Sequence, residues 1–268
     1  MYQIKTCRNS DAHYVVLSSG LGGHGHFWAT QIEALSAYFH VLSYDQHGCH
    51  ADSDRLPEDY SFDDLAQQVF DILKQEKISQ FHFIGHAIGG FIGASLAVRC
   101  QSTDLTMLSL SCINTWYQLD PHTEKCFAAR LHLLQNSGAD AYVRAQALFL
   151  YPPAWISQHH HAITQAENKQ LADFPPICNV KKRIQLAQNF QFTEQHQHAL
   201  QSVALHFIAN QDDFLVPVAQ SKKLQHYFGH GTLCQFPTGA HASTVTEPAQ
   251  INTALLSFLH RLSVQNAS

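Results

Sequence analysis

The sequence predicts an α/β fold in which helices cover both faces of a mostly parallel β-sheet. Short apolar runs of strand type alternate with segments of helical periodicity, and two of the runs end in glycine-rich turns. The composition is that of an ordinary globular chain, with 45% hydrophobic residues in 268. Alternation of this kind predicts parallel strands joined by helical crossovers, in one large domain with room for a subdomain.

The expected elements follow one another along the chain. Strands are expected at residues 13–18, 41–44, 81–84, 105–110, 203–209 and 232–236. Helices are expected at residues 31–39, from residue 61, after residue 88, and at 218–228 and 248–262. Ser61 can cap its helix, because Asp64 stands three residues further on, as in a capping box.

The alternation stops between residues 116 and 200. This segment has helical periodicity over 127–134 and 142–149 and is interrupted by proline pairs at 152–153 and 175–176. We expect residues 116–200 to form a helical lid (cap) inserted into a core made of residues 1–115 and 201–268. A lid over the carboxyl ends of parallel strands can enclose a small substrate and exclude water.

The segment Gly85-His86-Ala87-Ile88-Gly89 has the spacing of a nucleophile elbow, the G-x-S-x-G turn between a buried strand and a helix. The position of the nucleophile holds Ala87. We therefore expect no acyl-serine intermediate at this position. His86 is expected to pack or to form a hydrogen bond beside the elbow, or to face the pocket.

An acid and a histidine complete the constellation. Asp213 follows the expected strand at 203–209, and His241 follows the expected strand at 232–236. Nucleophile, acid and histidine in this order are typical of α/β-hydrolases, here with only the first member altered. We expect Asp213 to orient His241, and the backbone N–H groups of Leu21 and Ile88 to form an oxyanion hole.

The loop Gly20-Leu21-Gly22-Gly23-His24-Gly25 allows another interpretation. It matches G-x-G-x-x-G after a strand, and Asp45 lies twenty residues beyond Gly25, as in a dinucleotide site. This alternative leaves the elbow, Asp213 and His241 unexplained, whereas an oxyanion hole also needs a glycine loop here.

Several motifs together resemble one family. They are the run from Ser19 to Trp28 and residues 44–48, 85–89, 149–152, 212–217 and 239–241. They are similar to the α/β-hydrolase-fold proteins of the Rut pyrimidine-utilisation pathway, the RutD family, over nearly the whole chain. The resemblance implies a role in uracil catabolism, with carbamate or 3-aminoacrylate as substrate and Asp213 and His241 as the working pair.

Two other classes of function stay open. An elbow without a nucleophile fits a catalytically silent scaffold that binds a small molecule. A His-Asp pair could also abstract a proton in a lyase or a cofactor-free oxygenase. Trp28, Trp116 and Trp155 are expected either to line the pocket or to pack in the core.

Charge, hydropathy, and the cysteine and histidine patterns limit which binding partners are expected. A net charge of −5 and only one short basic run argue against nucleic acid, and no apolar stretch is long enough for a membrane span. Seven scattered cysteines without a Cys-x-x-Cys pair predict a reduced, cytoplasmic environment. His159, His160 and His161 are expected to be surface residues, because adjacent side chains diverge on a helix. We expect a small-molecule substrate and neither metal nor cofactor.

Overall fold

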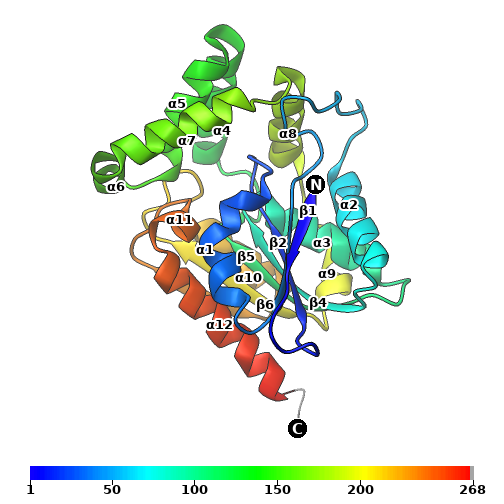
Figure 1. The fold of residues 1–268 in the computed structure, drawn as a ribbon. Helices are drawn as coiled ribbons and strands as arrows, with labels where there is room; N and C mark the ends of the chain where they lie inside the picture. Colours follow the sequence, from blue (N-terminus) through cyan, green and yellow to red (C-terminus); the bar gives the residue numbers. More distant parts are fainter. Residues whose placement is uncertain (266–268) are drawn as a thin grey trace.

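A computed structural model of the protein describes residues 1–265. Its sheet has seven strands in the order β1-β3-β2-β4-β5-β6-β7, parallel except for β1 (Figure 1). The strands are β1 Tyr2–Lys5, β2 Tyr14–Ser18, β3 His40–Tyr44, β4 Gln80–His86, β5 Thr106–Ile113, β6 Ala204–Asn210 and β7 Thr232–Phe236. The prediction of a mostly parallel sheet is confirmed. The short antiparallel edge strand β1 has no counterpart among the strands expected from the sequence.

Helices cover both faces of this sheet (Figure 1). On one face lie α1 (Ala29–Leu35), α12 (Pro248–Gln265) and the 3₁₀ turn η1 (Gly25–Trp28); the other carries α2 (Phe62–Gln75), α3 (Ile88–Cys100), α9 (Glu194–Leu200) and α10 (Val218–Phe228). Neighbouring strand residues alternate between two apolar cores: Val16 packs toward α3 and Val15 toward α12. Burial on both faces explains why these strands are continuous apolar runs.

Helix α2 begins where the sequence predicts. The side chains of Ser61 and Asp64 form a capping box, and the Ser61 backbone N–H donates to Asp64 Oδ2 at 2.7 Å. Helix α3 starts directly at the elbow, with Ala87 as its N-cap residue. The elbow joins a strand that is buried except at Gln80 to a helix that is buried except at Val98 and Arg99.

Helices from the segment between β5 and β6 lie together beyond the carboxyl ends of the parallel strands (Figure 1). They are α4 (Pro121–Asn136), α5 (Gly138–Leu150), α6 (Pro153–Gln158), α7 (His160–Ala172) and α8 (Ile177–Asn189). Prolines stand at the first turns of α4 and α6, where a missing N–H costs nothing. Residues of α4, α5 and α7 face the loops that follow β2 and β4 across a cavity.

Within the described part of the chain, no helix has the combined length and apolar character that crossing a membrane demands. All seven cysteines are free thiols.

Candidate active site

Ala87 occupies a strained turn between β4 and α3. Its backbone has φ 51° and ψ −113°, a conformation that costs a residue with a Cβ about 1–3 kcal/mol. The neighbouring glycines are required by contact: a Cβ on Gly85 would lie 2.2 Å from the Gly89 carbonyl carbon, and one on Gly89 would lie 2.2 Å from the Ser18 carbonyl oxygen. The turn thus has the geometry of a nucleophile elbow, with a methyl group where a hydroxyl would stand.

Asp213 and His241 are in direct contact. His241 Nδ1 lies 2.9 Å from Asp213 Oδ2, and both side chains are almost fully buried. The other carboxylate oxygen, Oδ1, accepts the backbone N–H groups of Leu215 at 2.8 Å and Val216 at 2.9 Å. With Nδ1–H donated to Asp213, the lone pair of His241 Nε2 is free, because this atom has no hydrogen-bond partner in residues 1–265.

The loop that carries His241 is held by Asp212. Its carboxylate accepts the backbone N–H groups of Gly239 at 3.1 Å and Ala240 at 2.8 Å. Both loop residues have positive φ, 126° and 52°, so the chain turns sharply just before the histidine. The Ala242 N–H donates to the Leu150 carbonyl at 3.0 Å, which links this loop to the end of α5.

Two buried side chains fix the backbone of His241. His86 Nε2 lies 2.8 Å from the His241 carbonyl oxygen, and Asn114 Nδ2 donates to the same oxygen at 2.7 Å. Burial, with a smaller contribution from His241, lowers the pKa of His86 to about 3. His86 is therefore neutral and donates from Nε2, a structural partner of His241 rather than an acid or base.

Leu21 and Ile88 line the same cavity as Ala87 and His241. Ile88 is the first residue of α3, so its N–H has no acceptor within the helix. The Leu21 N–H has no acceptor in the described residues, while its carbonyl accepts from Arg183 Nε at 3.3 Å. Arg183, buried on α8, also donates to the His47 carbonyl at 3.1 Å and to Gln46, and so holds the glycine loop from above.

These groups open onto a cavity of about 920 Å³ between the strand ends and α4, α5 and α7. Trp116 and His86 contribute to its wall. Trp28 does not: η1 turns it inward, and it is fully buried in the core between the sheet, α1 and α12. The expectation that Trp28 could line the pocket is therefore wrong. Trp155 stacks on His159 at 4.1 Å between ring centroids, away from the cavity wall.

Arg130 on α4 brings a buried cation to this cavity. The residue is only 3% exposed, and its Nη2 donates to the Tyr142 hydroxyl at 3.1 Å. Its Nε has no hydrogen-bond partner, and no carboxylate among residues 1–265 pairs with it. A buried guanidinium without a counter-ion is costly, so this arrangement favours an anionic ligand.

The glycine loop and Asp45 have a structural explanation. Asp45 Oδ1 accepts the Gly25 backbone N–H at 2.8 Å, and Oδ2 lies 3.3 Å from His50 Nε2. Asp45, twenty residues after Gly25, thus closes the glycine loop by a hydrogen bond. The carboxylate that would bind a ribose in a dinucleotide site is already engaged.

Among residues 1–265, no cysteine lines the cavity in place of the serine. Cys49 lies near the glycine loop, but burial raises its pKa to about 12, and its side chain does not line the cavity. His159, His160 and His161 are exposed, the first before α7 and the others in its first turn.

A parallel, doubly covered sheet with an elbow, then an acid and then a histidine at successive strand ends defines an α/β-hydrolase-fold protein. The family described as alpha/beta hydrolase fold matches residues 14–248. Among solved structures, the enol-lactonase from Burkholderia xenovorans LB400 has a TM-score of 0.81 at 20% identity, covering 97% of this chain and 96% of that one. At this identity the likeness concerns the fold alone.

Curated relatives are closer. A protein of Acinetobacter baylyi named "Putative carbamate hydrolase RutD" is 51% identical over 258 residues, covering 96% of this chain and 97% of that one. A protein of the same name from Pantoea ananatis is 39% identical over 260 residues, covering 97% and 93%. The chain belongs to the RutD family of α/β-hydrolase-fold proteins.

Proposed function

We propose that this protein hydrolyses the C–N bond of a small, labile, carboxylate-bearing amine of pyrimidine catabolism, using Asp213 and His241 without a serine nucleophile. Carbamate is the first candidate substrate, since the curated relatives carry that name, and 3-aminoacrylate is the second. The observation that carries the proposal is the buried 2.9 Å contact between Asp213 and His241, on a cavity where the elbow presents only a methyl group.

In this mechanism His241 acts on water. Nε2 takes a proton from a water molecule lying where the serine oxygen would have been, and the water oxygen bonds to the carbon that bears the nitrogen. His241 then returns the proton to that nitrogen, and the C–N bond breaks with its electron pair on nitrogen. Carbamate and water give ammonia and bicarbonate, the hydrated form of carbon dioxide; 3-aminoacrylate and water give ammonia and the corresponding aldehyde acid.

The backbone supplies electrostatic stabilisation. The N–H groups of Leu21 and Ile88 would donate to the oxygen on which negative charge grows, at the wall of the cavity. Ile88 also stands at the N-terminus of the thirteen-residue helix α3, whose dipole favours negative charge. Removal of one such donor in other enzymes costs roughly 10²–10³ in rate.

Arg130 accounts for the choice of a carboxylate substrate. Carbamate and 3-aminoacrylate both carry a carboxylate, and the Arg130 guanidinium is buried at the cavity without an acidic partner in the described residues. A carboxylate that enters would provide the missing counter-charge through charge-assisted hydrogen bonds. Arg130→Met should therefore raise KM by roughly 10²-fold while changing kcat much less.

The substrate must be labile because the catalytic triad lacks its serine. Removing the serine from a full triad costs about 10⁶ in rate and leaves roughly 10³–10⁴ over water. An acceleration of that size does not hydrolyse a stable amide on a useful timescale. It is sufficient for carbamate and 3-aminoacrylate, which already decompose spontaneously.

The test measures substrate decay directly. Freshly dissolved carbamate is followed by stopped flow with a pH indicator, and 3-aminoacrylate by its ultraviolet absorbance, each against the uncatalysed rate. We expect acceleration of one substrate by the unmodified protein, loss of that acceleration in His241→Ala, and no loss in the exposed control His161→Ala. Equal rates with the unmodified protein and His241→Ala, with both folded, would refute the mechanism.

A silent binding protein is the second candidate. The observation in its favour is the cavity of about 920 Å³, which is far larger than carbamate requires. It predicts ligand-induced thermal stabilisation without turnover of either substrate. It also predicts that Ala87→Ser gains activity toward a simple aryl ester, because His241 would then face a nucleophile.

A further inference from the structure

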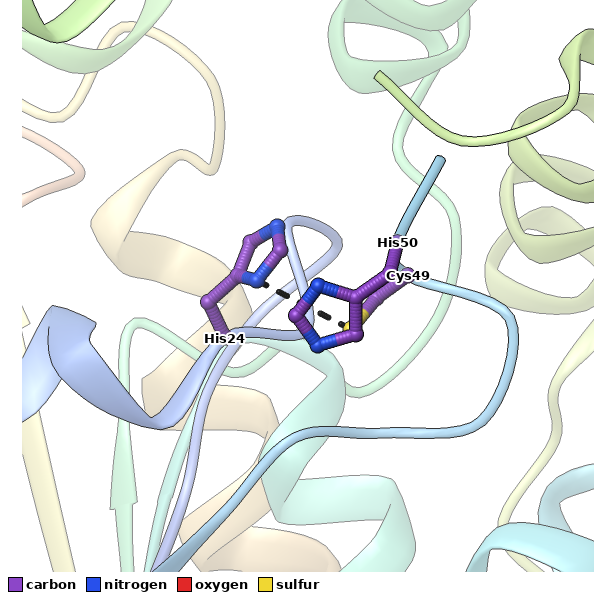
Figure 2. A group of neighbouring side chains, drawn as sticks. All are labelled: His24, Cys49 and His50. Atoms are coloured by element: carbon purple, nitrogen blue, oxygen red, sulfur yellow. Dashed lines mark hydrogen bonds between the residues drawn. The ribbon is translucent and has the colours of Figure 1, made fainter. Parts of the chain in front are cut away.

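Three side chains from two loops meet at the rim of the cavity, outside the Asp213–His241 site. His24 lies in the loop after β2, and Cys49 and His50 lie in the loop after β3. One nitrogen or sulfur atom from each lies within 4.8 Å of the others, and His24 Nδ1 is 3.8 Å from Cys49 Sγ. Figure 2 shows the three side chains converging on one point, with the dashed line joining His24 and Cys49.

We propose that His24, Cys49 and His50 form a binding site for a zinc-like divalent cation. Two imidazoles and one thiolate are ligands that Zn²⁺ prefers, and tetrahedral binding at about 2.0–2.3 Å separates neighbouring ligand atoms by about 3.5 Å. The 3.8 Å separation of His24 Nδ1 and Cys49 Sγ therefore needs only a small adjustment. The Cys49 thiol would lose its proton on binding the ion.

The surroundings of His50 support a metal-binding role. Its Nδ1 lies 2.7 Å from Asp173 Oδ2, the carboxylate–histidine contact that orients a metal ligand and frees Nε2. Nε2 is buried and makes no hydrogen bond of acceptable geometry, although Asp45 Oδ2 lies 3.3 Å away. An ion beside Nε2 would give this atom a partner and would have the Asp45 carboxylate close by as a fourth ligand or counter-charge.

The position of the site suggests what an ion would do there. His24 and Asp173 both line the cavity. Asp173, at the end of α7, also accepts the Ala51 backbone N–H at 2.9 Å. A bound ion would therefore join the loop after β2 to the loop after β3. Through the contact of His50 with Asp173, it would also link both loops to the helices above the cavity.

The experiment titrates chelator-treated full-length protein with Zn²⁺ against a chromophoric chelator, and separately with Co²⁺ by absorption spectroscopy. We expect one tightly bound equivalent of Zn²⁺ and a thiolate-to-cobalt charge-transfer band in the near ultraviolet. Cys49→Ser should abolish the band and weaken Zn²⁺ binding by on the order of 10²-fold. The exposed control Cys178→Ser should change neither measurement.

Twenty histidines make a second control necessary. Simultaneous replacement of His159, His160 and His161 by glutamine should leave the tight equivalent in place. The proposal is overturned if no equivalent binds tightly, if the band is absent or survives in Cys49→Ser, or if the equivalent disappears with the surface histidines.

Discussion

Asp213→Asn is the substitution that isolates the role of the acid. Oδ1 of Asp213 accepts two backbone N–H groups, from Leu215 and Val216, so an asparagine must keep its oxygen at that position. The NH₂ group of the asparagine then takes the place of Asp213 Oδ2, which lies 2.9 Å from His241 Nδ1, and donates to that nitrogen. His241 must accept at Nδ1 and carry its proton on Nε2, the tautomer that cannot take a proton from water.

The expected loss follows from this forced tautomer. A correctly placed general acid–base contributes roughly 10²–10⁴ in rate, so Asp213→Asn should lose at least about 10² of the acceleration of substrate decay. The geometry of the pair is nearly isosteric, so the melting temperature and the near-ultraviolet circular dichroism should change little. The control is Asp140→Asn, an exposed position on α5. Unchanged kcat/KM in folded Asp213→Asn would refute the reasoning.

Three further predictions concern stability, each measured by urea unfolding. Burial lowers the pKa to about 3 for His86 and to about 4 for His82 and His206, whereas the unfolded chain binds these protons near pH 6.5. Between pH 7 and pH 5 the unfolded state therefore gains protons that the folded state does not bind. The free energy of unfolding should fall by about 5 kcal/mol over this range. His206→Phe should remove about a third of this slope, and equal stability at both pH values would contradict the assignment. Gly89→Ala should cost about 3 kcal/mol or more, since its Cβ would lie 2.2 Å from a carbonyl oxygen of β2, whereas Gly22→Ala has open space and should cost less than about 0.5 kcal/mol. Arg183→Met should lower the free energy of unfolding by about 3 kcal/mol, because its hydrogen bonds to the glycine loop and to residues 46 and 47 are lost. The control Arg55→Met, at an exposed position, should leave it unchanged. Equal unfolding midpoints for the two variants would show that Arg183 does not stabilise the loop.

Local patterns were sufficient for most of the fold. Strands in the middle of the sheet, such as β2 and β3, are buried on both faces, so each is an apolar run that the sequence reveals. The edge strand β7 is only partly buried and still has the predicted bounds of residues 232–236. The edge strand β1 pairs on one side only and is four residues long, too short for a pattern to stand out. The pair Asp213 and His241 could be predicted because parallel strands end at one edge of the sheet.

The supporting side chains could not be predicted in the same way. Arg130 reaches the cavity because of how α4 lies above the sheet, and no spacing in the sequence encodes that position. Asn114 and Asp212 act through backbone groups of a loop more than twenty-five residues away, so their partners depend on tertiary structure. The same holds for His24 and Cys49, which come from two loops. The sequence leaves Trp28 open between pocket wall and core, because an aromatic residue beside a glycine loop fits both equally well.

The turn at Ala87 keeps the strained backbone conformation of a nucleophile elbow although it carries no nucleophile. A relaxed turn at Ala87 would redirect the start of α3 and withdraw the Ile88 N–H from the cavity. Tight contacts around Gly85 and Gly89, and the hydrogen bond from Thr115 to the Ala87 carbonyl at 2.9 Å, hold the turn in place. The turn therefore keeps Ile88, the first residue of α3, in the wall of the cavity that His241 also lines, although it presents no hydroxyl. Under the proposed mechanism, His241 would act as the base and the Ile88 N–H as an oxyanion donor, with water in the place of serine.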